Sequence, residues 1–367
     1  MKDVKPPFRA DQVGSLLRPA ALRDARAKAK AGELDAHGLR DAQDRAIRES
    51  VAKQEAIGMP VVTDGEFRRD WWNVDFWSRF DGIEAGKGGG TVTLFSGDDQ
   101  PAIIVVTGKV RRTKPAVVDD FKFLKSVTKN AVPKITVVAP AVAYHRTGRA
   151  TISEEAYPDL EEFWADISAA LREEIRALGE AGCTYLQVDD TSFAYLCDAT
   201  LREEFRERGD DPDDLIRTYT RALNDALAGR PAGMTVALHS CRGNFRSTWA
   251  AQGGYEPVAE TLFNDVNADA YLLEFDSDRA GGFEPLRFLP KGKKVVLGLV
   301  TSKAAQLENP DAILRRIDEA ARFADRDALC LSPQCGFSST HHGNALTEDQ
   351  QWRKLELVLE VSRRAWG

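Results

Sequence analysis

Short apolar runs alternate with longer segments of helical spacing along most of this chain. Outside one exceptional segment there are eight such runs, which end near residues 15, 66, 139, 190, 241, 274, 300 and 332. The runs are continuous, as is typical of parallel strands buried on both faces. Eight strand–helix units therefore predict an α/β fold, a single (β/α)8 TIM barrel. A doubly wound open sheet is the rival fold, but no Gly-rich phosphate loop follows the first run to support it.

The segment 67–133 departs from this alternation. It contains three tryptophans, a glycine-rich turn, two β-like runs and a helical stretch: Trp71, Trp72, Trp77, 86–90, 91–95, 103–110 and about 117–128. We interpret it as a hairpin and a helix inserted between strands 2 and 3 of the barrel. Because the sequence shows no internal repeat and no long Pro/Ser-rich linker, residues 1–367 are predicted to form one domain.

Charge and hydropathy restrict the class of protein. The net charge of -7 argues against a general nucleic-acid-binding protein, which would need a basic face. No apolar run approaches the ~18 residues of a membrane span, and the first residues have no apolar signal region. We therefore expect a soluble cytoplasmic protein that binds neither nucleic acid nor membrane. Five cysteines in such a chain are expected to be reduced thiols, not a disulfide framework.

Polar and metal-binding side chains gather where the predicted strands end. Alternate residues of a strand share a face, so His239 and Cys241 point to the same side of the run 234–241. In a TIM barrel all strand ends meet at one mouth, where active sites lie. The residues expected there are Ser15, Asp64, Glu66, His145, Arg146, Asp189, Asp190, His239, Cys241, Glu274, Asp276, Lys303 and Cys335.

Four of these residues offer the donor set of a zinc site. His239, Cys241, Glu274 and Cys335 supply one imidazole, two thiolates and one carboxylate, and two thiolates favour zinc over magnesium or calcium. Displacement of Glu274 by an incoming thiol would leave three ligands and one exchangeable position, as catalytic zinc requires. Zinc would hold that thiol as a thiolate, ready to attack an electrophilic carbon. His239 alone could instead be a hydrogen-bonded core histidine, and Asp276 competes with Glu274 as ligand.

The sequence resembles the catalytic domain of cobalamin-independent methionine synthase through most of its length. The matching stretches are Val13-Gly14-Ser15, Asp64-Gly65-Glu66, Gln187-Val188-Asp189-Asp190, His239-Ser240-Cys241, Glu274 and Ser332-Pro333-Gln334-Cys335-Gly336-Phe337. The resemblance implies the same four zinc ligands. It also implies that Ser15, Glu66 and Asp189 hold the substrate amino acid. There is no room for the duplicated N-terminal barrel of the full-length synthase, so the chain is similar to the short, single-barrel branch.

Two stretches differ from the synthase pattern on the side that receives the alkyl donor. The chain reads His145-Arg146-Thr147-Gly148-Arg149 where the synthases carry a Trp-Ser pair associated with folate. It reads Thr301-Ser302-Lys303 where they carry an Asp-x-His that supplies the proposed proton donor. Both differences argue against a folate donor. We predict that Lys303, Arg146 or His145 binds the donor or stabilises its leaving group.

These features favour zinc-dependent transfer of an alkyl group to a small thiol such as homocysteine. A methyl group is the favoured alkyl group. The donor could be a folate, methylcobalamin on a corrinoid partner protein, or a small methylated compound. An alternative resembles the related epoxyalkane:coenzyme M transferases, in which a thiol opens an epoxide. A third alternative is a zinc-binding module without turnover. A homo-oligomer is compatible with all three.

Overall fold

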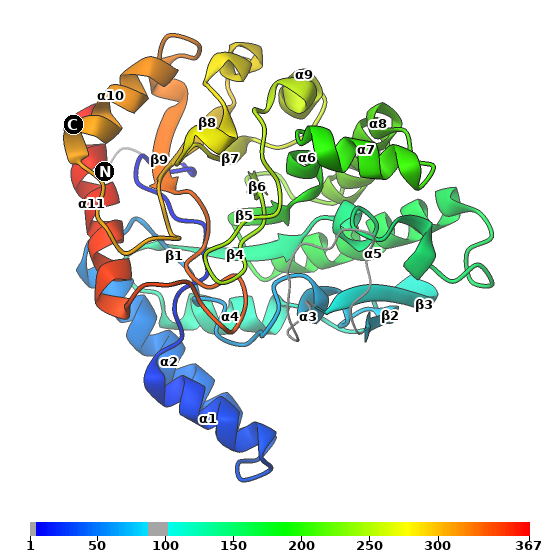
Figure 1. Ribbon diagram of the computed structural model, residues 1–367. Helices are drawn as coiled ribbons and strands as arrows, with labels where there is room; N and C mark the ends of the chain where they lie inside the picture. Colours follow the sequence, from blue (N-terminus) through cyan, green and yellow to red (C-terminus); the bar gives the residue numbers. More distant parts are fainter. Residues whose placement is uncertain (1–4, 87–101) are drawn as a thin grey trace.

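The computed structural model describes residues 5–86 and 102–367, and its centre is a curled sheet of seven parallel strands (Figure 1). The strand order in the sheet is β1-β4-β5-β6-β7-β8-β9. The strands are Val61–Val62 (β1), Val132–Val138 (β4), Tyr185–Asp190 (β5), Thr235–Ser240 (β6), Ala270–Glu274 (β7), Lys294–Val300 (β8) and Leu329–Pro333 (β9). Every residue of β5 and β7 is buried, as is typical of parallel strands covered on both faces.

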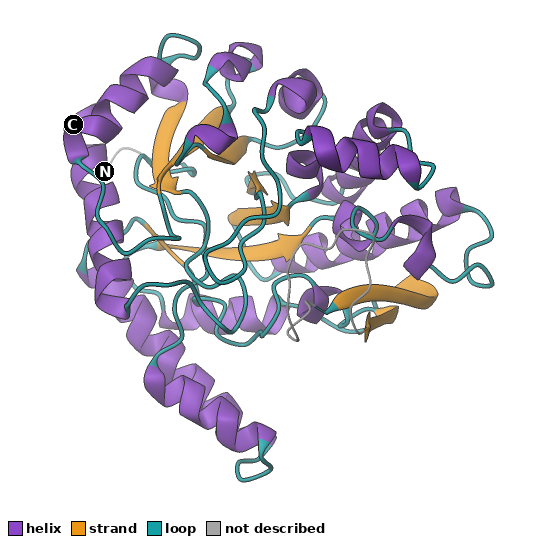
Figure 2. Ribbon diagram, in the orientation of Figure 1, coloured by secondary structure: helices purple, strands orange, loops and turns teal. Residues whose placement is uncertain are grey.

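Helices surround the sheet and connect its parallel strands (Figure 2). The α-helices are Ala20–Lys30 (α1), Ala36–Ala56 (α2), Val74–Trp77 (α3), Val118–Val127 (α4), Leu160–Glu180 (α5), Ser192–Tyr195 (α6), Ala199–Glu207 (α7), Pro212–Leu227 (α8), Glu256–Asn264 (α9), Pro310–Ala320 (α10) and Glu348–Trp366 (α11). The 3-10 helices are Pro140–Ala143 (η1), Gly148–Thr151 (η2), Asp278–Ala280 (η3), Glu284–Phe288 (η4) and Arg326–Ala328 (η5). Among the described residues, no helix combines the length and apolarity needed to cross a membrane.

Helical spacing runs through residues 199–228 and predicts a single helix, but the segment forms two helices, α7 and α8. The chain leaves α7 at Gly209, which adopts a left-handed φ of 93°. Asp211 then caps α8 by accepting a hydrogen bond from the Asp213 amide, and Pro212 occupies the first turn. The inward face of α8 buries Leu223 and its neighbours, and burial of one such leucine contributes roughly 1.5–3 kcal/mol. Helical spacing alone did not reveal this break, although the Gly and Pro residues that cause it are visible in the sequence.

The N-terminal strand of the predicted barrel is reduced to a single parallel bridge between Ala10 and Leu331. The side chains of Lys134 and Gln12 hold this segment in place through three hydrogen bonds. The buried Lys134 ammonium binds the Gln12 carbonyl and also the Asp11 carboxylate at 3.0 Å. The Gln12 side chain then donates to the Val61 carbonyl of β1 at 3.0 Å. The structure is thus consistent with a TIM-barrel-type fold, but the described residues form seven strands in this sheet where eight were predicted.

The segment predicted as an insertion contains an antiparallel strand pair. β2 (Asp81–Gly86) pairs with β3 (Ile103–Arg111). The run predicted at 91–95 lies outside the described residues, and β2 was not predicted from the sequence. The predicted helix near 117–128 is confirmed as α4, which packs against β4, α2 and α5 as part of the helical layer around the sheet. The limits 67–133 and the single-domain organisation stay predictions.

Candidate active site

The His-x-Cys pair lies at the carboxyl end of β6. His239 is opposite Asp189 of β5 in the parallel register, and the Cys241 amide continues the pattern by donating to the Asp190 carbonyl at 2.7 Å. Both His239 and Cys241 are buried. They line the same cavity, as expected for alternate residues of one strand.

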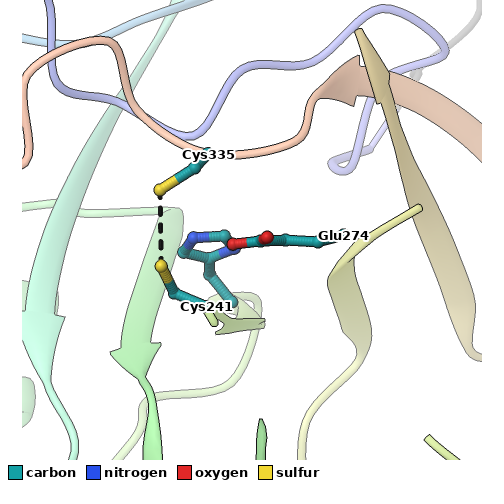
Figure 3. Close-up of side chains that lie close together, drawn as sticks. Cys241, Glu274 and Cys335 are labelled. Atoms are coloured by element: carbon teal, nitrogen blue, oxygen red, sulfur yellow. Dashed lines mark hydrogen bonds between the residues drawn. The ribbon is translucent and has the colours of Figure 1, made fainter. Parts of the chain in front are cut away.

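The four predicted ligands converge on one point. The candidate donor atoms of His239, Cys241, Glu274 and Cys335 all lie within 4.8 Å of one another. Figure 3 shows the Cys241 and Cys335 sulfurs facing each other and the Glu274 carboxylate directed toward them. The sulfurs are 3.4 Å apart, and both cysteines are free thiols. The cluster joins β6, β7 and the turn after β9, three elements far apart in the sequence.

The hydrogen bonds of His239 fit a metal ligand. Its Nδ1 lies 3.3 Å from the Leu272 carbonyl, which selects the tautomer with the proton on Nδ1. Its buried Nε2 has no nitrogen or oxygen partner among the described residues and instead has the Cys335 sulfur as its neighbour. A ring nitrogen that faces thiols in a buried cluster is in the position that a zinc ligand takes.

Glu274 is the acid of the cluster, and Asp276 supports it from outside. The Glu274 Oε1 accepts a hydrogen bond from the Arg242 amide at 3.0 Å, and Oε2 accepts one from Arg279 at 3.0 Å. Arg279 also binds Asp276 at 2.8 Å. Such partners orient a ligating carboxylate and fix its geometry. The sequence alone left Glu274 and Asp276 as competitors, and the structure places Glu274 in the cluster.

The pKa values of the two thiols are shifted in opposite directions. The hydrogen bond from Cys241 and the charge of nearby His239 hold the pKa of Cys335 well below its usual range, although burial opposes this. The same hydrogen bond, together with burial, raises the pKa of Cys241. Lys303 lies close enough for its positive charge to lower both thiol pKa values. The pair is therefore poised to lose its first proton from Cys335, as a metal-binding thiolate must.

The predicted substrate-binding residues line the cavity beside this cluster. Ser15, Glu66 and Asp189 line one cavity together with His239, Cys241 and Cys335. The remaining lining residues that carry polar or aromatic side chains were not identified from the sequence: Arg69, Trp72, Thr191, Asn244 and Ser339.

Glu66 and Asp189 place two carboxylates in this cavity. Glu66 has a left-handed φ of 57°, a strained conformation for a side-chain-bearing residue, and follows Gly65 in the same region at 65°. Its carboxylate forms an ion pair with Arg69. Asp189 accepts a hydrogen bond from Gln187 at 2.7 Å, while burial raises its pKa. Arg69 follows the Asp-Gly-Glu motif by three residues, so its proximity to the site could have been suspected from the sequence.

The three residues predicted for the donor side are not gathered at one point. The Lys303 ammonium lies 3.4 Å from the Gly243 carbonyl at the rim of the cavity. Arg146 lines a neighbouring cavity. His145 is fully buried, with Nδ1 3.2 Å from the Val142 carbonyl and Nε2 2.9 Å from the Thr191 hydroxyl. Burial and the charge of Arg146 keep its pKa far below the usual value, so the ring is neutral and supports Thr191 in the cavity wall. Direct donor contact by these residues stays a prediction.

A substitution at Gly336 tests substrate binding in this cavity without changing any charge. A Cβ at this position would lie 1.9 Å from the Ser15 Oγ. We expect Gly336→Ala to displace Ser15, close the cavity and weaken binding of an amino-acid thiol by at least about tenfold, a loss of about 1.4 kcal/mol. Isothermal titration with the thiol measures this. Gly108→Ala is the control, because its new Cβ meets no atom closer than 3.7 Å. Equal affinity in both variants would place the thiol elsewhere.

The buried carboxyl group of Asp64 makes the free energy of unfolding depend on pH. Burial raises its pKa to about 6, and its carboxylate accepts a hydrogen bond from the Glu66 amide at 2.8 Å. Between about pH 4 and 6 the folded protein keeps a proton that the unfolded chain has lost, so stability falls as pH rises. Asp64→Asn is expected to be more stable than the parent at pH 8, by up to about 3 kcal/mol, and to match it at pH 4.

Urea unfolding at both pH values measures this difference. Asp24→Asn, which changes an exposed acid of α1, is the control. A gain for Asp64→Asn that is the same at pH 4 and pH 8 would contradict the assigned role of the buried carboxyl.

Comparisons with known proteins agree with this site. A family model for the cobalamin-independent synthase catalytic domain matches residues 8–354. The Bacillus subtilis (strain 168) protein named Uncharacterized protein YxjH is 46% identical over 366 residues, covering 100% of this chain and 96% of the relative. A methionine synthase of Sulfurisphaera tokodaii is 25% identical over 331 residues, covering 88% of this chain and 84% of the relative.

A solved structure gives the same assignment. A crystal structure from Listeria monocytogenes, provisionally described as a vitamin-B12 independent methionine synthase, is 35% identical with a TM-score of 0.79 and covers 100% of both chains. The match of the family model over most of the chain agrees with the ligand cluster and the neighbouring cavity. The chain belongs to the family of the cobalamin-independent synthase catalytic domain.

Proposed function

We propose that the protein transfers a methyl group from a small donor to the thiol of homocysteine or a closely similar amino acid, at a zinc site formed by His239, Cys241, Glu274 and Cys335. One observation carries the proposal. The four ligand atoms lie within 4.8 Å of one another, and three of these residues line the cavity that also holds Glu66 and Asp189. A site for a soft metal and a site for an ammonium group therefore adjoin each other.

The cavity orients the substrate. Glu66 and Asp189 offer carboxylates to the ammonium group of the amino acid, and Arg69 offers a guanidinium to its carboxylate. With the polar end held in this way, the thiol end is directed to His239, Cys241 and Cys335. This fixed geometry lowers the entropic part of the barrier.

Methyl transfer needs a thiolate nucleophile. When bound, zinc lowers the pKa of a thiol so that it is deprotonated at neutral pH. The substrate sulfur then forms a bond to the methyl carbon. The bond from that carbon to the leaving group breaks, and the leaving group keeps the electron pair of that bond. Lys303, whose charge already acts on the two cysteines, favours negative charge at this end of the cavity.

The other donors and acceptors are less well supported. The family description is cobalamin-independent, so a corrinoid partner protein as methyl donor has no support. The sulfonate of coenzyme M would meet the carboxylates of Glu66 and Asp189 in this cavity, and like charges repel. The acids favour an amino-acid thiol.

The proposal is tested by measuring product formation by the zinc-loaded protein for each combination of acceptor and donor. Homocysteine and coenzyme M are offered as acceptors, each with methyl-folate, methylcobalamin, a small methylated compound or epoxypropane. We expect methionine from homocysteine and no thioether from coenzyme M. Turnover of coenzyme M with epoxypropane alone would replace the proposal with the epoxide reaction. Tight zinc binding without turnover of any pair would indicate a binding module.

A further inference from the structure

A second cavity adjoins the thiol cavity. It shares Trp72, Thr191, Gly243 and Asn244 with the first cavity as a common wall. Asn244 is 8% exposed; its Nδ2 donates to the Gly336 carbonyl at 2.9 Å, while its Oδ1 has no partner among the described residues. A molecule in the second cavity is therefore placed next to a thiol held in the first.

Four aromatic side chains contribute to the lining of this second cavity. They belong to Trp71, Trp72, Tyr195 and Phe245. The Trp71 and Phe245 rings are nearly parallel, at 11°, with centroids 6.1 Å apart. Burial raises the pKa of Tyr195 to about 12, so this ring stays neutral at physiological pH. Neutral rings present electron-rich faces, which attract cations that have no hydrogen-bond donors of their own.

Among the described residues that line the second cavity, none is an aspartate, glutamate or histidine. The imidazoles of His341 and His342 make T-shaped contacts with the Trp71 ring but are not part of this lining. A donor whose leaving group must gain a proton as it departs would find no carboxylic acid or imidazole in the wall itself.

From these observations we propose that the second cavity binds a methyl onium zwitterion, a trimethylammonium or dimethylsulfonium group joined to a carboxylate, and that this compound is the methyl donor. The inference rests on the proposed methyl transfer. The substrate thiolate attacks a methyl carbon and forms a carbon–sulfur bond. The bond from that carbon to the positive nitrogen or sulfur breaks, and its electron pair stays on the leaving atom. The donor departs as a neutral amine or thioether group, and no proton transfer is required. Arg146, in the same lining, places positive charge near the donor carboxylate.

Binding is tested with pairs of ligands that differ only in charge at the onium centre. Glycine betaine is compared with 3,3-dimethylbutyrate, and S-methylmethionine with 2-amino-5-methylhexanoate, by isothermal titration of the zinc-loaded protein. We expect at least one onium ligand to bind about tenfold or more tightly than its carbon isostere, because desolvated cation–π contacts favour the cation. The pair that shows the larger preference identifies an ammonium or a sulfonium donor. Equal affinity within both pairs overturns the proposal.

Two variants of Trp71 show whether the rings cause the preference. Trp71→Leu is expected to reduce the preference to less than about threefold, whereas Trp71→Phe retains most of it. Circular dichroism confirms that both variants fold, and a preference that survives Trp71→Leu contradicts the assignment of Trp71. Methionine formation from homocysteine then separates the two proposals. Methylation by another donor without an onium preference refutes only the second cavity's role, whereas an onium preference without methylation by any donor refutes the proposed function.

Discussion

Replacing Cys335 with serine is expected to remove zinc from the protein and abolish turnover. The parent should contain about one zinc per chain, the complement of one four-ligand site. The substitution removes one of two thiolates whose sulfurs are 3.4 Å apart. Loss of a residue that merely orients a ligand already costs about 10–100-fold in metal affinity, so loss of a ligand should cost at least about 100-fold. Elemental analysis after dialysis against a chelator measures the retained metal.

Cys330 provides the matched control. It is also a fully buried cysteine of the β9 region, but it is not one of the four clustered residues. Cys330→Ser buries the same new hydroxyl and should cost comparable stability, yet it should retain the full zinc content. Full zinc retention in Cys335→Ser, or equal loss in both variants, would refute the ligand assignment.

Glu66→Gln is expected to weaken recognition of the substrate ammonium group. A hydrogen bond to a charged group contributes about 1.5–3 kcal/mol, so kcat/KM for homocysteine should fall by roughly 10–150-fold. Glu66 also pairs with Arg69, and the substitution leaves that buried guanidinium without its closest counter-charge. Steady-state kinetics with saturating methyl donor measure the change.

The control is a thiol without an ammonium group. For 4-mercaptobutyrate, the des-amino analogue of homocysteine, kcat/KM should be low in the parent and change less than about threefold in Glu66→Gln. Glu84→Gln, a change on the peripheral strand β2 away from the lining of this cavity, should leave both substrates unaffected. A similar fall for both thiols in Glu66→Gln would show that Glu66 supports the fold or the metal and does not bind the ammonium group.

The sequence predicted the cluster of His239, Cys241, Glu274 and Cys335 because simple periodicity determines where most of its members lie. His239 and Cys241 share a face of β6, and the carboxyl ends of neighbouring parallel strands meet at one edge of the sheet. The position of Glu274 at the end of β7 follows from the same rule. The convergence with Cys335 could be expected, but the distances could not.

The parts that the sequence did not predict depend on tertiary contacts. The first predicted strand forms only a bridge, and the buried Lys134 side chain binds the Gln12 carbonyl beside it. His145 ends up buried behind Thr191, although its position in the sequence suggested a place at the mouth. Periodicity does not specify such long-range side-chain contacts. For the same reason the cavity residue Asn244 was not recognised, although it follows Cys241 by three residues.

Zinc binding and thiol activation are both visible in X-ray absorption at the zinc edge, recorded with and without homocysteine. We expect two sulfur neighbours for the metal in the free protein, from Cys241 and Cys335, and three after homocysteine is added. Homoserine, which has a hydroxyl in place of the thiol, should leave the spectrum unchanged. A spectrum that does not change with homocysteine or with coenzyme M would contradict thiol activation at this site.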